Sequence, residues 1–324
     1  MTIRQKIIVP IIALAIVLSI SFLSISFFSF RAYIADTGEK KVRGSVFTAD
    51  EFFKVRLALS GQCAQRMAYS PGFSALLQKR DFPALLDCIE SVEQEAGVDF
   101  TVITDAQGIV LLRSHSEMAG DDISMTSSAK IALTGKANAM VISGHATRLT
   151  TTGRSPVYND SGEIIGAVVT GFLMDKDEYV DTLKVLTNAE ISVFLGDTRI
   201  ATTVKDREGV RITGTKMDGK VAESVLAGKA FFGPIGAAGQ EVFAAYLPLF
   251  SDGTVVGSLA VGSYLAPQKT AFWNFAGKML LAVLLTLFVL IAICTRVIDK
   301  TVAPIKQMSV AAENLDSVYT SFML

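Results

Sequence analysis

The sequence predicts an α+β protein in which two tandem antiparallel sheet modules lie between two membrane-spanning helices. Three observations support this fold class. A set of turn residues recurs after 91 to 93 positions, two long stretches are almost free of charge, and a helical pattern follows the first of these stretches. Together these features cover nearly all of the 324 residues.

The repeat consists of punctuating residues that keep one register in both copies. The pairs are Asp105 with Asp197, Gly135 with Gly228, Pro156 with Pro248, Gly166 with Gly257, and Gly171 with Gly262. Alternating and β-branched runs between turn sequences indicate antiparallel strands. We expect strands at 99–104, 109–113, 139–143, 164–172, 191–194, 199–204, 242–246 and 254–261, with helices at 125–133 and 220–226. The pattern therefore predicts modules at 98–174 and 190–271, joined by a helix at 175–189.

The first apolar stretch, 7–30, follows a short N-terminus, 1–6, that carries Arg4 and Lys6. Its 24 uncharged residues would form a helix about 36 Å long, which exceeds the roughly 30 Å of a bilayer core. A cleaved signal peptide is the alternative. The apolar run is too long for a signal sequence, and the small residues Ser24 and Ser26 are followed by further apolar residues. We therefore expect an uncleaved membrane helix.

The second apolar stretch is 272–295, which begins with the interfacial aromatics Phe272 and Trp273. Lys278 lies near its start and can extend its ammonium group to the interface. Basic residues after the second stretch favour a cytoplasmic C-terminus. Basic residues also closely follow the first stretch, so the charges around that stretch do not clearly place the N-terminus in the cytoplasm. Charge alone therefore leaves the orientation open.

Residues 31–97 are expected to form a stalk followed by shorter helices. The pattern over 32–67 is helical, and Pro71 and Gly72 interrupt it. An apolar stripe on a long lone helix is poorly solvated, so we expect a homodimer through this stalk.

Composition and motifs exclude several classes of function. A net charge of -1 with 19% charged residues argues against nucleic-acid binding. No nucleophile motif or phosphate loop is present, so we expect no enzyme activity and no cofactor. The two histidines lack metal-ligand spacing, so we expect no metal. Cys63 and Cys88 could meet in a disulfide, but two small buried residues are the favoured interpretation.

The order of these segments, together with Val302-Ala-Pro-Ile-Lys-Gln-Met308, resembles the sensory half of bacterial methyl-accepting chemotaxis proteins with a double Cache input domain. The stretch Gly196-Asp-Thr-Arg-Ile-Ala-Thr-Thr203 is similar to the membrane-proximal Cache unit of that group. The resemblance implies PAS-like modules, a multi-pass protein of the bacterial inner membrane, and an extracytoplasmic region at 31–271. It also implies a ligand-binding receptor that transmits a signal across the lipid bilayer.

Residues 296–324 resemble the first helix of a HAMP linker, but the pattern stops after Asp316. We therefore expect a partial, truncated HAMP segment. Kinase and coupling proteins would be partners only if a C-terminal signalling domain exists in the full gene product. The alternatives are the input half of a sensor histidine kinase or diguanylate cyclase, or a membrane-anchored binding module without output.

The first module is similar to Cache sensors that bind citrate or C4-dicarboxylates, which implies a small organic anion held by cationic and hydroxyl groups. The candidate ligand-binding residues are Arg113, Ser114, His115, Arg148, Thr150, Thr152 and Arg154. The related sensors place an arginine four residues before the equivalent of Pro156, where this chain has Thr152, so the ligand is expected to differ. The alternative interpretation treats Arg148 and Arg154 as solvated charges on an edge strand.

Overall fold

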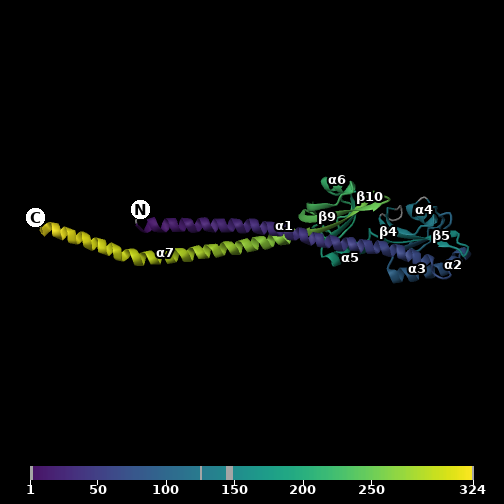
Figure 1. Cartoon of the computed structure of the whole chain (residues 1–324), viewed down its shortest axis with the longest axis horizontal. Helices are drawn as coiled ribbons and strands as arrows, with labels where there is room; N and C mark the ends of the chain where they lie inside the picture. The colour runs from purple at the N-terminus through teal and green to yellow at the C-terminus, as the bar shows by residue number, and fades with distance from the viewer. Residues whose placement is uncertain (1–2, 125, 144–148, 323–324) are drawn as a thin grey trace. The chain divides into compact units, whose positions relative to one another are not determined.

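The computed structural model describes residues 3–124, 126–143 and 149–322. Figure 1 shows the chain coloured from the N-terminus to the C-terminus. In order, the elements are α1 (Ile3–Ala68), α2 (Phe73–Lys79), α3 (Phe82–Ala96), β1 (Phe100–Asp105), β2 (Val110–Arg113), α4 (Ser127–Leu133), β3 (Asn138–Ile142), β4 (Thr150–Tyr158), β5 (Ile164–Leu173), α5 (Asp177–Thr187), β6 (Glu190–Leu195), β7 (Thr198–Thr202), α6 (Gly219–Leu226), β8 (Phe231–Ala237), β9 (Gln240–Ser251), β10 (Thr254–Tyr264) and α7 (Ala266–Phe322).

The first module is an antiparallel sheet with strand order β2-β1-β5-β4-β3. Helix α1 lies directly on one face of it, at Gly153 of β4. A Cβ atom added at Gly153 would come within 2.1 Å of the Ser60 carbonyl group. Ser60 also bonds to this face, because its carbonyl accepts the Thr170 hydroxyl at 2.7 Å. Helix α4 covers the opposite face of the sheet (Figure 1).

The second module repeats this topology with strand order β7-β6-β10-β9-β8. The same order in both sheets confirms the α+β fold with two equivalent antiparallel modules. The edge strand β8 was not expected from the sequence, because Gly233 and Pro234 weaken the strand signal. As an edge strand, β8 tolerates a proline that cannot donate a ladder hydrogen bond.

A shared apolar core joins the two modules and α5. Leu149 of the first module, Leu183 of α5 and Leu249 of β9 are all buried in one cluster, with Ala49 of α1. The Ser45 hydroxyl donates to the Thr187 carbonyl at 3.0 Å, which ties the end of α5 to α1. Residues 38–265 accordingly form one compact unit.

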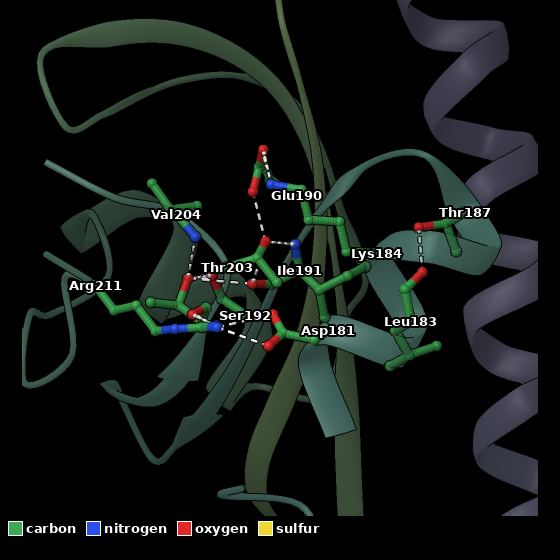
Figure 2. Close-up of polar contacts among 11 residues, drawn as sticks. Asp181, Leu183, Lys184, Thr187, Glu190, Ile191, Ser192, Thr203, Val204 and Arg211 are labelled. Atoms are coloured by element: carbon green, nitrogen blue, oxygen red, sulfur yellow. Dashed lines mark hydrogen bonds and ion pairs between the residues drawn. The ribbon is translucent and has the colours of Figure 1, made fainter. Parts of the chain in front are cut away.

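Ion pairs connect α5 to the second module (Figure 2). Arg211 donates to both carboxylate oxygens of Asp181 at 2.9 and 2.7 Å. Lys184 donates to Glu190 at 2.7 Å, and the carboxylate of Glu190 accepts the Thr203 hydroxyl at 2.5 Å. Helix α5 is therefore fixed to the strands β6 and β7 as well as to α1.

Residues 1–37 and 266–324 form a separate unit. Within it, 9–30 and 270–297 are long and apolar enough to cross a membrane, each with a mean hydropathy of 2.6. Large apolar side chains such as Phe28 and Phe288 are exposed there, as expected for helices that face lipid. The aromatic rings of Phe27 and Phe272 lie 5.2 Å apart.

Some local expectations differ from the structure. The first apolar stretch and the stalk form one continuous helix, α1, because no turn residue separates them. The helix expected at 125–133 begins at Ser127, after the N-cap Thr126, and Met125 lies outside the described residues. Asp105 of the first repeat accepts the backbone N–H groups of Gln107 and Ile109 in its turn. The Asp197 carboxylate instead accepts from the Thr198 hydroxyl and from Lys216.

Cys63 and Cys88 are both free thiols in the structure. Cys63 is buried beside Phe172, and burial raises the pKa of its thiol. Cys63 thus fits the favoured interpretation of a small buried residue, whereas Cys88 is only partly buried.

Candidate functional site

The face of the first sheet opposite α1 carries a group of polar side chains. We call it the polar face. Because α1 lies on Gly153, the neighbouring residues of β4 point to the other side of the sheet. The polar face comprises Arg113, Asn138, Met140, Thr150, Thr152 and Arg154, with Phe100, Val102 and Val169 between them. Three of the predicted ligand residues of β4 therefore share one face.

Arg154 is the central charged residue of the polar face. Its exposed fraction is 0%, although an arginine is rarely buried in this way. Its Nε donates to Asn138 Oδ1 at 2.6 Å, and its Nη2 donates to the Met140 sulfur. Burial lowers the pKa of Arg154 to about 10, while the negative charge of Asp252 opposes this shift. The guanidinium is therefore still a cation at neutral pH.

The burial of Arg154 overturns the alternative of a solvated edge-strand charge. Strand β4 is an inner strand, paired with β3 on one side and with β5 on the other. A buried cation is costly unless strong acceptors surround it. A thioether is a weak acceptor, whereas a carboxylate binds a guanidinium through charge-assisted hydrogen bonds. An anion would thus be a better partner for Arg154 than the Met140 sulfur.

Two threonine hydroxyls lie on the same strand as Arg154. Thr150 and Thr152 are 1% and 2% exposed, and their hydroxyl oxygens are 2.7 Å apart. The Thr150 hydroxyl also donates to the Ile142 carbonyl at 3.4 Å. Each hydroxyl can both donate and accept, so the pair can turn a proton towards an anion beside Arg154.

Arg113 lies in the same cross-strand row as Arg154. The pairs Val102 with Arg113, Val102 with Val169, and Arg154 with Val169 connect the two arginines across four strands. Three strand spacings separate their backbones by about 14 Å. This distance allows both side chains to approach one small ligand from opposite sides.

The guanidinium of Arg113 is occupied by a loop in this structure. It donates to both carboxylate oxygens of Asp121 at 2.6 Å and to the Met118 carbonyl at 2.7 Å. The hydrogen bonds from Arg113 lower the pKa of the Asp121 carboxyl group. A ligand carboxylate would have to compete with Asp121 for Arg113, so Arg154 is the stronger candidate.

The remaining predicted residues lie away from Arg154. The Ser114 oxygen accepts the Thr101 backbone N–H at 2.9 Å, which extends the ladder between β1 and β2. His115 is exposed at the end of the sheet, and its ring lies 5.6 Å from that of Phe100. Partial desolvation of its imidazole lowers the pKa of His115, and the charge of Arg113 adds to this effect. Arg148 lies outside the described residues.

Sequence reasoning missed three residues of this site. Asn138 and Met140 on β3 contact Arg154 because β3 pairs with β4, and Asp121 pairs with Arg113. Asn138 follows the repeated Gly135 by three positions, as Phe231 follows Gly228. A polar residue in one copy and an aromatic residue in the other was therefore a signal that could have found Asn138.

The equivalent face of the second sheet carries a large apolar cluster together with buried polar residues, among them Arg199 and Ser258. Helix α6 fills it with Val221 and Val225, which pack against Phe194, Tyr246 and Ala260. Its one buried arginine, Arg199, donates to the Thr215 hydroxyl at 2.6 Å and lies 4.9 Å from the Phe194 ring centroid. The first module differs in that its buried arginine, Arg154, lies on an inner strand that also carries the Thr150 and Thr152 hydroxyls.

The polar face favours binding over catalysis. It carries the guanidinium groups of Arg113 and Arg154 and the hydroxyls of Thr150 and Thr152, while its other side chains are neutral or apolar. The described residues contain no group of three or more His, Cys, Asp or Glu side chains that could hold a metal ion. The groups on this face are able to donate hydrogen bonds to an anionic group.

Two sequence profiles described as single Cache domain 3 match the chain, one over residues 57–183 and the other over 172–273. No curated protein sequence matches it. Among solved structures, the sensory domain of the Campylobacter jejuni chemoreceptor Tlp3 (CcmL) is similar. Its TM-score is 0.50 at 13% identity, over 75% of this chain and 98% of that chain.

Two further structures are similar at lower scores. The Tlp3 ligand-binding domain in complex with 4-methylisoleucine has a TM-score of 0.49 at 14% identity, over 74% of this chain and 94% of that chain. The periplasmic domain of Vibrio cholerae LuxQ has a TM-score of 0.48 at 15% identity, over 68% and 99%. At 13% identity, the likeness to the Tlp3 (CcmL) sensory domain shows the fold alone.

Proposed function

We propose that this chain, which carries two consecutive Cache modules, is the sensing part of a transmembrane chemoreceptor. It binds a small organic anion on the outer side of the bacterial inner membrane. The observation that carries this proposal is Arg154, a fully buried cation on the polar face of the first module. Arg154 can present charge-assisted N–H donors to an anionic ligand on this face.

The ligand class follows from the donors on the polar face. Arg154 supplies a planar fork of N–H groups, and Thr150 and Thr152 supply hydroxyls within hydrogen-bond distance of each other. A carboxylate matches the guanidinium fork in shape and in charge. A second carboxylate on the same ligand would reach Arg113, in competition with Asp121. A small mono- or dicarboxylate is therefore the first candidate.

An α-amino acid is the second candidate ligand, and Asp121 is the observation that favours it. Its carboxylate lies beside Arg113 and would accept a ligand ammonium group, while Arg154 holds the ligand carboxylate. The two candidates differ in the role of Asp121. Substitution of Asp121 with asparagine weakens the binding of an amino acid and strengthens, or leaves unchanged, the binding of a dicarboxylate.

The path of the signal follows the chain from the polar face. Strand β5 carries Val169 on that face and leads into α5, which is fixed to α1 and to the second module (Figure 2). Strand β10 of the second module then leads into α7. A ligand that stabilises one arrangement of these elements would shift the population of two receptor states. The same input would serve a histidine kinase or a diguanylate cyclase, which stay alternative outputs.

The test is calorimetric titration of the full chain in lipid nanodiscs against carboxylates, amino acids and purines. Arg154→Gln keeps a polar side chain of similar length and removes the charge. It is expected to weaken the binding of an anionic ligand at least tenfold, because a charge-assisted pair is lost. The matched control is Arg207→Gln, an exposed arginine of the second module. Equal affinity in the wild type and Arg154→Gln would reject the polar face as the site.

A further inference from the structure

A cavity lies where α1, β5 and α5 meet. It is on the α1 side of the first sheet, opposite the polar face. Its volume is about 70 Å³, which is room for a few water molecules or a small ligand. Stalk residues Phe52 and Arg56, Phe172 of β5 and Tyr179 of α5 line it. The cavity therefore touches the strand that leaves the polar face and the helix that connects the two modules.

Arg56 is held in this cavity by aromatic rings. The carbon at the centre of its guanidinium lies 4.3 Å from the ring centroid of Phe172 and 5.1 Å from that of Phe52. Stacking against rings orients the guanidinium plane and leaves its N–H groups to donate. No hydrogen-bond acceptor or carboxylate partner for the Arg56 side chain is found among the described residues. Arg56 is thus an oriented cation with donors to offer.

Tyr179 supplies a second donor. Its side chain is 7% exposed, and its ring packs edge-on against Phe52 at 5.6 Å. The Tyr179 hydroxyl is buried and has no hydrogen-bond partner among the described residues. Burial raises the pKa of this hydroxyl, against the opposing charge of Arg56, so it stays protonated. A buried hydroxyl without a partner is unfavourable, and an acceptor in the cavity would remove that cost.

The other charged groups of the cavity limit the ligand that it accepts. Lys176 and Asp99 neutralise each other at 2.6 Å, and a second oxygen of Asp99 accepts the Leu173 N–H at 2.8 Å. Glu178 is an exposed lining residue and would repel an anion. With one oriented cation, one neutral donor and little space, the cavity suits a single negative charge on a small molecule.

We propose that this junction cavity is a second binding site, which takes a small monocarboxylate between the Arg56 guanidinium and the Tyr179 hydroxyl. An occupant would join α1 to α5 directly. The other side of α5 is already fixed to the second module through Asp181 and Arg211 (Figure 2). A ligand here would therefore stiffen the connection between the modules and modulate the signal that starts at the polar face.

The experiment uses the full chain in lipid nanodiscs, with Arg154→Gln in every sample so that the polar face does not contribute. Acetate and propionate are titrated by calorimetry, with chloride and methylammonium as controls. Acetate and propionate are expected to bind, whereas chloride and methylammonium are expected not to bind. Tyr179→Phe removes only the hydroxyl, and it is expected to weaken binding about tenfold or more, since a hydrogen bond to a charged group is lost.

Two additional variants test whether the carboxylate binds in the junction cavity. Arg56→Gln is expected to abolish binding, whereas Glu178→Gln is expected to strengthen it severalfold because a repelling charge is removed. Without ligand, Tyr179→Phe is expected to keep the melting temperature of its parent, since the hydroxyl makes no bond within the protein. Absence of acetate and propionate binding, or equal affinity with and without the Tyr179 hydroxyl, overturns the junction site. Neither result bears on Arg154, so the proposed function is tested separately.

Discussion

Arg154 and Tyr246 occupy equivalent positions in the two sheets. Each lies two residues before the repeated proline, pairs with β3 or its counterpart β8 on one side, and pairs with the central strand on the other. Both are buried, at 0% and 3% exposure. Tyr246 packs among aromatic and aliphatic side chains, whereas Arg154 bonds to an amide and a sulfur. The same place in the fold thus holds a neutral phenol in one module and a buried cation in the other.

This equivalence predicts the effect of Arg154→Tyr. The substitution gives the first module the residue that the second module uses, so the sheet is expected to fold. Anion binding at the polar face is expected to be lost, because a neutral phenol replaces the cation. Calorimetry with the best ligand of the panel measures the loss, and circular dichroism checks the fold. Retained affinity in a folded Arg154→Tyr chain would contradict the assignment.

The pair Arg113–Asp121 predicts a pH dependence. The Asp121 pKa is lowered below its ordinary value of 3.8, chiefly by the hydrogen bonds from Arg113. A carboxyl group with a lowered folded-state pKa stabilises the fold above its unfolded pKa, and this stabilisation is lost as the pH falls through the folded value. The melting temperature of the wild type should therefore exceed that of Asp121→Asn at pH 6. The difference should decrease as the pH falls below 3.8, and a difference that does not decrease would refute the pair.

The close approach of α1 to β4 predicts a strong effect of Gly153→Ala. The added Cβ would lie 2.1 to 2.2 Å from backbone atoms of Ser60 and Gly61, which cannot move without displacing the helix. A loss of about 3 kcal/mol or more in the free energy of unfolding is expected. Gly219→Ala is the matched control, because nothing lies within 4 Å of its Cβ position. The control should be neutral or slightly stabilising, by about 0.5 kcal/mol.

The contact between Arg211 and Asp181 predicts a measurable coupling of α5 to the second module. Their side chains are 22% and 49% exposed, so solvent screens the pair. A double-mutant cycle with Arg211→Gln and Asp181→Asn is expected to give a coupling of about 0.5 to 1 kcal/mol that decreases at high salt. A zero coupling at low salt would show that the apolar core alone holds α5.

The stalk predicts a homodimer. Phe47 and Val55 are 69% and 60% exposed on α1, and such apolar side chains on one helix favour a second copy as partner. Val55→Cys in membranes is expected to form a disulfide-linked dimer upon mild oxidation. Glu90→Cys, on an exposed position of α3, serves as the control and should stay monomeric. Failure of Val55→Cys to cross-link faster than this control would count against the stalk interface.

The sequence by itself determined the two modules and the apolar helices, because these depend on local requirements. Gly135 and Gly228, for example, both take positive φ values, of 84° and 80°, which glycine adopts without strain. Hydropathy likewise depends only on composition along the chain. Such requirements restrict the residue type at each position, so they can be recognised without knowing which other residues it contacts.

Only the tertiary structure decided which of the candidate ligand-binding side chains are buried and which groups they contact. Arg154 could have been a solvated edge charge until the pairing of β4 between β3 and β5 placed it inside the sheet. Asn138, Asp121 and the neighbours of Arg56 came from other segments, brought close by strand pairing and helix packing. Burial and hydrogen bonding depend on contacts between residues distant in sequence, and no local pattern records those contacts.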